Sequence, residues 1–177
     1  ILVINSLGKS IERQEDIKLL KGTARFADDI PYRKDTLHVA FVRSVHSHAR
    51  IVSIDVSKAL NIYGVEEVIT GKEIKEWSRP FVVGVKQPME HWCLAVDKVR
   101  YVGEPIAIVI AQNRYIAEDA LELIDVQYEE LVSVISISDA IKCDAPVLHE
   151  KVNSNIVSSR NFNYGNVEKA FSEAKHI

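Results

Sequence analysis

Three segments in the first half of the chain have the hydrophobic patterning of β-strands. They are residues 37–44, 49–56 and 65–70. In the first segment, Leu37, Val39 and Phe41 share one face at a period of two. In the second segment, Ile51 and Ile54 fall out of strict alternation. A short helix is predicted over residues 57–63, where Asp55 or Ser57 provides a cap and Gly64 an end, and a capped helical turn is predicted over residues 70–77.

A second set of strands is predicted at residues 98–102, 105–111 and 125–131. The segment 105–111 is apolar on both faces, as in a central buried strand. Asn113 can cap a helix over residues 114–124, because Ile116, Ala120 and Ile124 recur at the four-residue spacing of one helix face. The predicted order is therefore β-β-α-β, a loop, and β-β-α-β again.

The two ends of the chain differ in character from this centre. Residues 1–21 are predicted to form an extended, irregular lead-in to a domain at residues 22–134. Residues 135–177 are polar and rich in turn-forming residues, and end in a short amphipathic helix at residues 167–175. A domain ending there would leave this helix little to pack on, which indicates a truncation or a split gene.

Composition limits the classes of partner that need consideration. The 177 residues carry a formal net charge of -3, so nothing points to nucleic acid or to an anionic membrane. The longest apolar run is too short to cross a bilayer. Cys93 and Cys143 lack a CxxC spacing, which suits a reducing cytosol, and we expect both thiols to be small residues in or near the core.

The triplet Gly103-Glu104-Pro105 separates two of the predicted strands. Glu104 could be a general base, since burial can raise the pKa of a carboxyl group. It could also be a turn residue, because Gly103 permits conformations that other residues resist and Pro105 pushes the preceding residue into the extended region. We interpret the triplet as a structural turn in which Glu104 accepts hydrogen bonds from backbone or from arginine.

Other residues with catalytic or metal-binding chemistry have weaker patterns. His46 and His48 could share a strand face and a metal ion, but no other ligands follow by sequence, and a polar strand edge bonded to backbone is the preferred interpretation. The pairs Asp28-Asp29 and Glu129-Glu130 are adjacent, so their members would face opposite ways on a strand. No GxSxG, Walker or GxGxxG motif occurs. We therefore assign no catalytic, cofactor-binding or metal-binding residue.

The segment between residues 77 and 92 is predicted to be a loop with a concentration of large apolar side chains. Interfaces favour aromatic residues and Met, so this loop is a candidate contact surface for a partner protein. Its candidate contact residues are Trp77, Phe81, Met89 and Trp92.

Several of these segments, in this order, resemble the large subunit of the molybdenum hydroxylases, the family of xanthine dehydrogenase, aldehyde oxidase and molybdenum carbon monoxide dehydrogenase. The most specific is LAVDKVRYVGEPIAIVIAQNRYIAEDALELIDVQYEEL. GTARFADDI, LHVAFVRSVHSHARIVSIDVSKAL and GVEEVITGKEI precede it, and PVLHE and GNVEKAFSEA follow it. The resemblance covers about residues 6–175, and it implies an α+β fold, the α/β-hammerhead domain, for which we expect a mixed sheet with packed helices.

The resemblance also implies what the complete enzyme would contain. Such enzymes use a molybdopterin-molybdenum cofactor, [2Fe-2S] clusters and usually FAD to oxidise aldehydes, heterocycles or carbon monoxide. The expected partners are the molybdenum-binding remainder of the large subunit, an iron-sulfur subunit and a flavin subunit, all in the cytoplasm. We expect this chain to be a non-catalytic domain that serves assembly. The alternatives are a free-standing protein-binding module derived from that domain and a small metal-binding protein that uses His46 and His48.

Overall fold

The structure is a computed structural model that describes residues 8–81 and 89–176. Residues 1–36 and residues 37–177 form two units, each of which is described by itself. In the first unit, the expected extended lead-in contains a helix, α1 (Asp16–Leu20), so that expectation is wrong at these residues. A 3₁₀ turn, η1 (Ala27–Asp29), follows, and the Asp29 carboxylate accepts a hydrogen bond of 2.9 Å from the backbone N–H of Phe26.

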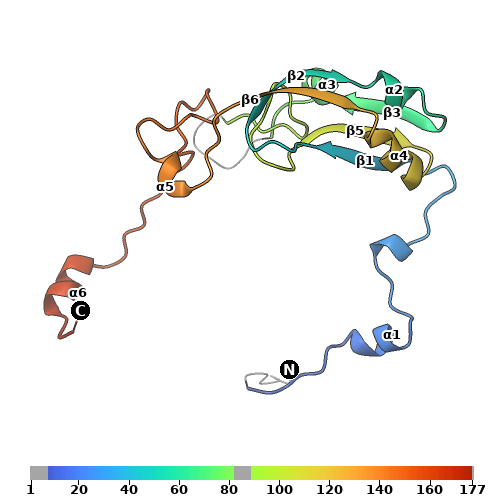
Figure 1. Cartoon of the computed structure of the whole chain (residues 1–177). Helices are drawn as coiled ribbons and strands as arrows, with labels where there is room; N and C mark the ends of the chain where they lie inside the picture. The colour runs from blue at the N-terminus through green and yellow to red at the C-terminus, as the bar shows by residue number, and fades with distance from the viewer. Residues whose placement is uncertain (1–7, 82–88, 177) are drawn as a thin grey trace. The chain divides into compact units, whose positions relative to one another are not determined.

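The second unit contains two three-stranded antiparallel sheets, which Figure 1 shows lying over one another. One sheet has the order β1 (His38–Arg43), β5 (Pro105–Ala111), β3 (Val65–Thr70). The other has the order β4 (Lys98–Val99), β2 (Ala49–Asp55), β6 (Asp125–Glu130). The expected mixed sheet is wrong, because each strand pair in the described residues is antiparallel. The strand expected at 98–102 ends at Val99, where a turn begins.

A register shift in β2 explains its broken alternation. Ile51 is opposite Tyr128 of β6, whereas Ser53 is opposite the adjacent Gln127, so β2 has one extra residue at Val52. An extra residue of this kind shifts the alternation of side chains by one position, so Ile51 before the bulge and Ile54 after it share a face of the strand. Ile51 and Ile54 are accordingly both half-buried, while Val52 is exposed.

Among the helices described in the second unit, all but the first, which follows Val56, begin after a residue whose side chain caps them. They are α2 (Ser57–Leu60), α3 (Gly71–Trp77), α4 (Arg114–Leu121), α5 (Ile137–Ala140) and α6 (Val167–Glu173). As predicted, the Asn113 side chain caps α4 by accepting from the N–H of Ile116 at 2.9 Å. Thr70 and Glu73 form a capping box at α3. The sequence patterning missed α5, a single turn within the polar connector.

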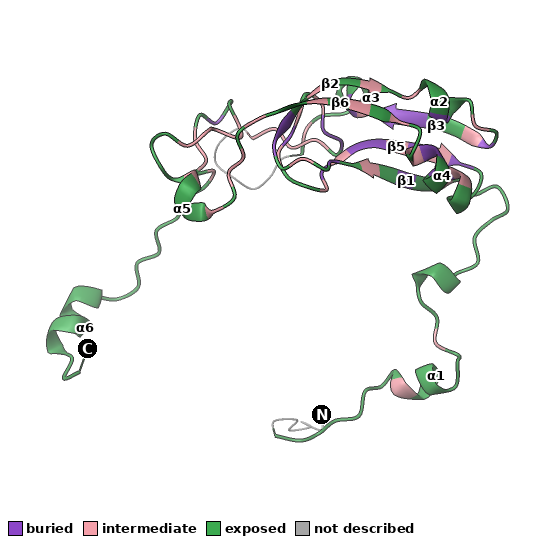
Figure 2. Cartoon of the chain, viewed as in Figure 1, coloured by how far each residue is buried: buried purple, intermediate pink, exposed green. Residues whose placement is uncertain are grey.

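The core has two parts, and β5 contributes to both. Val109 and Ala111 pack with Ala117 and Ala120 of α4 on one face of the sheet. Ile106, on the other face, packs with a second cluster of buried residues, Ala49, Ala95 and Val99. Figure 2 shows β5 buried along most of its length. This two-sided packing is why residues 105–111 are apolar on both faces.

The connector after residue 134 is braced by its own side chains. Asn155 donates to the carbonyls of Ala140 and Pro146 at 3.1 and 3.0 Å and accepts from the N–H of Leu148 at 3.0 Å. Val152 beside it is buried. Within residues 8–81 and 89–176, no helix is both long and apolar enough to cross a membrane.

Candidate functional site

The turn at Gly103-Glu104-Pro105 lies between β4 and β5 and is closed by backbone hydrogen bonds. Gly103 has a φ of +87°, a conformation that glycine adopts more easily than other residues. Its N–H donates to the carbonyl of Ser44 at 2.8 Å, and the N–H of Ser44 donates to the carbonyl of Glu104 at 2.9 Å. The turn is therefore fixed to the end of β1.

The side chain of Glu104 bends back into the same turn. It is 8% exposed, and one carboxylate oxygen accepts a hydrogen bond from the backbone N–H of Arg100. Burial raises the pKa of Glu104, because it disfavours the charged form, while the backbone bond and the charges of Arg100 and His91 oppose this rise. This geometry supports the interpretation of Glu104 as a turn residue, and its role in a complete enzyme stays a prediction.

A cavity of about 180 Å³ lies beside the turn. Glu104, Arg100, His91, Trp92 and His149 line part of it. Burial lowers the pKa of His149, and the nearby positive charges of Arg100 and His91 lower it further. The Arg100 guanidinium donates to the carbonyl of Leu148 at 2.8 Å, so it binds backbone just as the Glu104 carboxylate does. These bonds are typical of a braced loop rather than of an acid–base pair that awaits a substrate.

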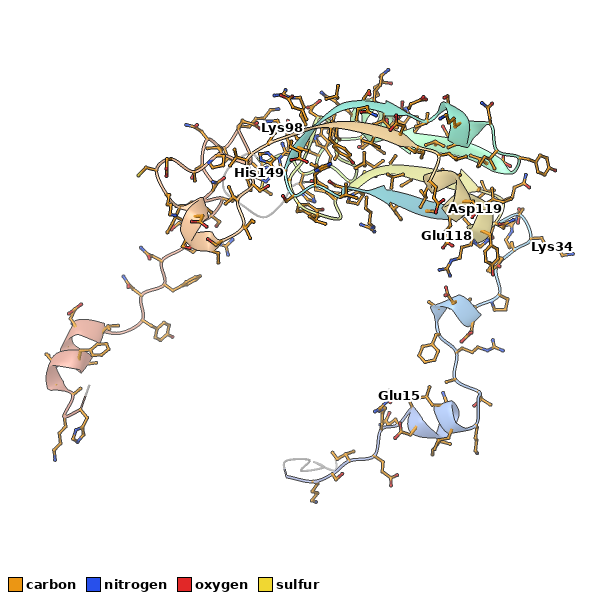
Figure 3. All side chains as sticks on the ribbon, viewed as in Figure 1. Glu15, Lys34, Lys98, Glu118, Asp119 and His149 are labelled. Carbon is orange, nitrogen blue, oxygen red and sulfur yellow. The ribbon has the colours of Figure 1, made fainter. Side chains whose placement is uncertain are left out.

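Ion pairs connect this site to the connector. Lys98 at the end of the sheet pairs with Glu150, and Lys151 pairs with Glu90. Burial lowers the pKa of Lys98, and the charge of Arg100 adds to this effect. Figure 3 labels Lys98 and His149, which both line a second cavity at this junction. The sequence patterning did not indicate that residues 148–151 would lie here, because nothing local signals a contact 50 residues away.

His46 and His48 lie in the bend between β1 and β2 and not on a strand. The His48 ring is buried, with Nδ1 2.8 Å from the carbonyl oxygen of Val132. The His46 ring packs against Tyr128 at a centroid distance of 4.7 Å, and its Nδ1 lies 3.4 Å from a Glu130 carboxylate oxygen. His48 is thus bonded to backbone, as in the preferred interpretation, although it lies in a bend and not at a strand edge. No cluster of three or more potential metal ligands occurs in the described part of the chain.

The cysteines and the paired glutamates lie at the surface. Cys93 and Cys143 are free and exposed, so the expectation that they lie in or near the core is wrong. Cys93 immediately precedes the buried Leu94, and local patterning did not separate the two environments. Both Glu129 and Glu130 are exposed, and Glu129 pairs with Arg50 across β2 and β6 at 3.0 Å.

The candidate contact residues between 77 and 92 have different environments. Trp77 ends α3 and is 61% exposed, and Phe81 is 57% exposed. Met89 and Trp92 are partly buried. The backbone N–H of Phe81 donates to the carbonyl of His91 at 2.7 Å, which closes the base of the loop. Residues 82–88 lie outside the described residues, and partner contact stays a prediction.

Comparison with known proteins assigns this architecture to a family. The family model described as "Aldehyde oxidase and xanthine dehydrogenase, a/b hammerhead domain" matches residues 21–132, more than half of the chain. The chain belongs to this family. The match includes both sheets, the turn at Glu104 and helices α2 to α4, so the α+β fold class and the hammerhead architecture are confirmed.

Curated relatives and solved structures agree with this assignment. The chain is 36% identical to the 6-hydroxypseudooxynicotine dehydrogenase complex subunit gamma of Paenarthrobacter nicotinovorans, over 97% of this chain and 22% of that protein. It is 37% identical to the carbon monoxide dehydrogenase large chain of Afipia carboxidovorans, over 84% of this chain and 18% of that protein. The crystal structure of quinoline 2-oxidoreductase from Pseudomonas putida 86 superposes on this chain with a TM-score of 0.68 and 43% sequence identity. The superposition covers 79% of this chain and 18% of the quinoline 2-oxidoreductase chain. The chain thus spans about a fifth of these relatives.

Proposed function

We propose that this chain is the hammerhead domain of the large subunit of a molybdopterin-dependent oxidoreductase, where it serves assembly and not chemistry. The observation that carries this proposal is the family match over residues 21–132, together with relatives about five times longer. The hammerhead domain comprises residues 22–134, residues 1–21 lead into it, and residues 135–177 connect it to the molybdenum-binding portion. The site at Glu104 supports a structural role, because its charged groups bind backbone atoms of this chain.

The redox groups of such an enzyme do not fit the residues of this chain. A [2Fe-2S] cluster is held by four ligands, usually Cys thiolates, and this chain has two cysteines, far apart in sequence. The phosphates of a pterin cofactor or of FAD are commonly held by glycine-rich loops, and the sequence has no GxGxxG or Walker motif. We assign molybdopterin to the remainder of the large subunit, [2Fe-2S] clusters to an iron-sulfur subunit and FAD to a flavin subunit. We place the assembly in the cytoplasm, because cysteines that do not form disulfides, such as Cys93 and Cys143, are typical of a reducing compartment.

The experiment that tests this function is affinity purification of the tagged chain from its native host. A denaturing gel and molybdenum analysis of the eluate follow, with the tag alone as the control. We expect molybdenum together with further large-subunit sequence, either in the same polypeptide or as a co-purifying chain. Recovery of the chain without molybdenum and without those sequences would contradict the proposal and would favour an orphan module that binds another partner.

A substitution in the complete enzyme tests the non-catalytic role of Glu104. Glu104→Gln keeps an oxygen that can accept from the Arg100 N–H but removes the ability to act as a base. We expect normal assembly and normal turnover per molybdenum. An enzyme that assembles with full cofactor content yet has no turnover would show that Glu104 takes part in the reaction.

A further inference from the structure

Four large apolar side chains are exposed at one corner of the second unit. Val45 is 76% exposed, Val102 64%, Tyr101 46% and Phe41 45%. Single exposed apolar residues are normal on any protein surface and need no explanation. A group of them held together by the fold is different, because contiguous exposed apolar surface commonly marks a contact site.

Hydrogen bonds from the backbone and from the Arg43 side chain hold these four residues at the same corner. Val45 follows Ser44, and Val102 precedes Gly103; Ser44 and Gly103 are joined by the 2.8 Å bond described above. The Arg43 guanidinium donates to the carbonyl of Gly103 at 3.0 Å and lies 5.3 Å from the centre of the Phe41 ring. The end of β1 and the turn after β4, 60 residues apart in sequence, therefore form one surface. We name it the turn patch: Phe41, Val45, Tyr101 and Val102.

The turn patch is also rigidly supported from beneath. The buried Glu104 carboxylate binds the N–H of Arg100 and so fixes the backbone on both sides of Tyr101 and Val102. At Gly103 a Cβ would meet no heavy atom within 4 Å, so the turn projects into open space. A preorganised apolar surface loses little conformational entropy on binding, which favours a stable contact over a transient one.

We propose that the turn patch is the surface on which the hammerhead domain docks against the remainder of its own large subunit. This inference rests on the proposed function and names the partner surface within it. Roughly four-fifths of the length of each relative lies outside the part that this chain matches. The connector is held at the same turn, because the Arg100 side chain donates to the carbonyl of Leu148. The chain beyond Leu148 therefore leaves from this turn, and a domain that follows the connector is joined covalently to the turn patch, which raises its effective concentration there.

Hydroxyl-radical footprinting of the isolated chain and of the intact enzyme tests this assignment, because it reports the solvent exposure of individual aromatic side chains. We expect Tyr101 and Phe41 to be oxidised severalfold more slowly in the intact enzyme. Tyr63, which is 90% exposed and outside the turn patch, is the internal control and should change little. Equal oxidation of Tyr101 and Phe41 in both samples would overturn the inference, as would equal protection of Tyr63.

A pair of matched substitutions tests the same surface by its energetics. Val102→Glu in the full-length large subunit places a charge in the proposed contact and should lower the yield of molybdenum-containing enzyme by about tenfold. Val52→Glu, at a residue that is 62% exposed on β2, should leave the yield unchanged. Both substitutions are at exposed sites, so both isolated chains should retain the urea midpoint of the unsubstituted chain.

The outcomes separate this inference from the proposed function. If the Val102→Glu enzyme assembles with as much molybdenum as the Val52→Glu enzyme, the docking role of the turn patch is wrong and the proposed function is unaffected. Failure to find any molybdenum enzyme that contains this chain would overturn both. Protection of the patch only when the iron-sulfur or flavin subunit is added, or only when the isolated chain self-associates, would assign the surface to that occupant and overturn the partner named here.

Discussion

Gly71 is the position where a single methyl group should have the clearest effect on stability. It is the first residue of α3 and is buried against the segment that contains Ala95. A Cβ at Gly71 would lie 2.1 Å from the carbonyl oxygen of Ala95 and 2.8 Å from the Cα of Val96. Carbon atoms of this kind normally approach to about 3.5–4.0 Å, so the two backbone segments would have to separate by more than an ångström.

Two opposing effects decide the sign of Gly71→Ala. Helix propensity favours Ala over Gly by about 1 kcal/mol in a helix interior. Overpacking a close backbone contact costs about 1–3 kcal/mol or more. Displacing Ala95 would also weaken the 2.7 Å bond from its N–H to the carbonyl of Pro105, a contribution of about 1 kcal/mol. The clash therefore wins, and we expect a net destabilisation of about 1–3 kcal/mol.

Urea unfolding of the 177-residue chain, followed by tryptophan fluorescence, measures this difference. Lys72→Ala is the matched control, because it is the next residue of the same helix and is exposed, so it should change the free energy of unfolding by less than about 0.5 kcal/mol. A Gly71→Ala chain as stable as the unsubstituted chain, or more stable, would refute the close approach of α3 to residues 95–96.

Three further predictions concern the turn and the core. Gly103→Ala should lower the free energy of unfolding by about 1–2 kcal/mol, because Gly103 has a φ of +87° that strains an alanine backbone. A Cβ at this position would meet no heavy atom within 4 Å, so the backbone strain acts alone. Urea unfolding measures the difference, and an unchanged midpoint would contradict the left-handed conformation of Gly103. Because burial raises the pKa of Glu104 above 4.5, its contribution to stability is fully present below pH 4.5 and is lost as the pH rises through the raised pKa. The stability advantage of the unsubstituted chain over Glu104→Gln should therefore shrink as urea unfolding is repeated from pH 4 to pH 8, and an advantage that grows with pH would contradict the direction of the shift. Ile106→Ala should lower the melting temperature strongly, at a cost of about 2–5 kcal/mol because Ile106 is fully buried. Val52→Ala, at the exposed bulge, should cost less than about 0.5 kcal/mol, and comparable losses at the two positions would contradict the assignment of Ile106 to the core.

Local sequence signals predicted the features whose physical cause is also local. The Asn113 cap and the turn at Gly103-Glu104-Pro105 involve contacts within about four residues. The apolar run 105–111 predicted a central strand because it must bury both faces. Burial of the cysteines and a strand edge at His46 and His48 were predicted wrongly, because exposure and strand ends depend on segments that are distant in sequence.

The sequence by itself determined the family, the succession of strands and helices between residues 37 and 134, and the turn at Glu104, since each follows from residue order, hydrophobic period or backbone preference. The tertiary structure alone decided how the strands divide between two antiparallel sheets, because the pairing of β1 with β5 joins residues more than 60 positions apart. It also decided which groups gather at the turn that contains Glu104. Arg100 is local, but the Ser44 backbone, the His91 side chain and the Leu148 carbonyl come from three other segments, and their convergence comes from packing that no local pattern encodes.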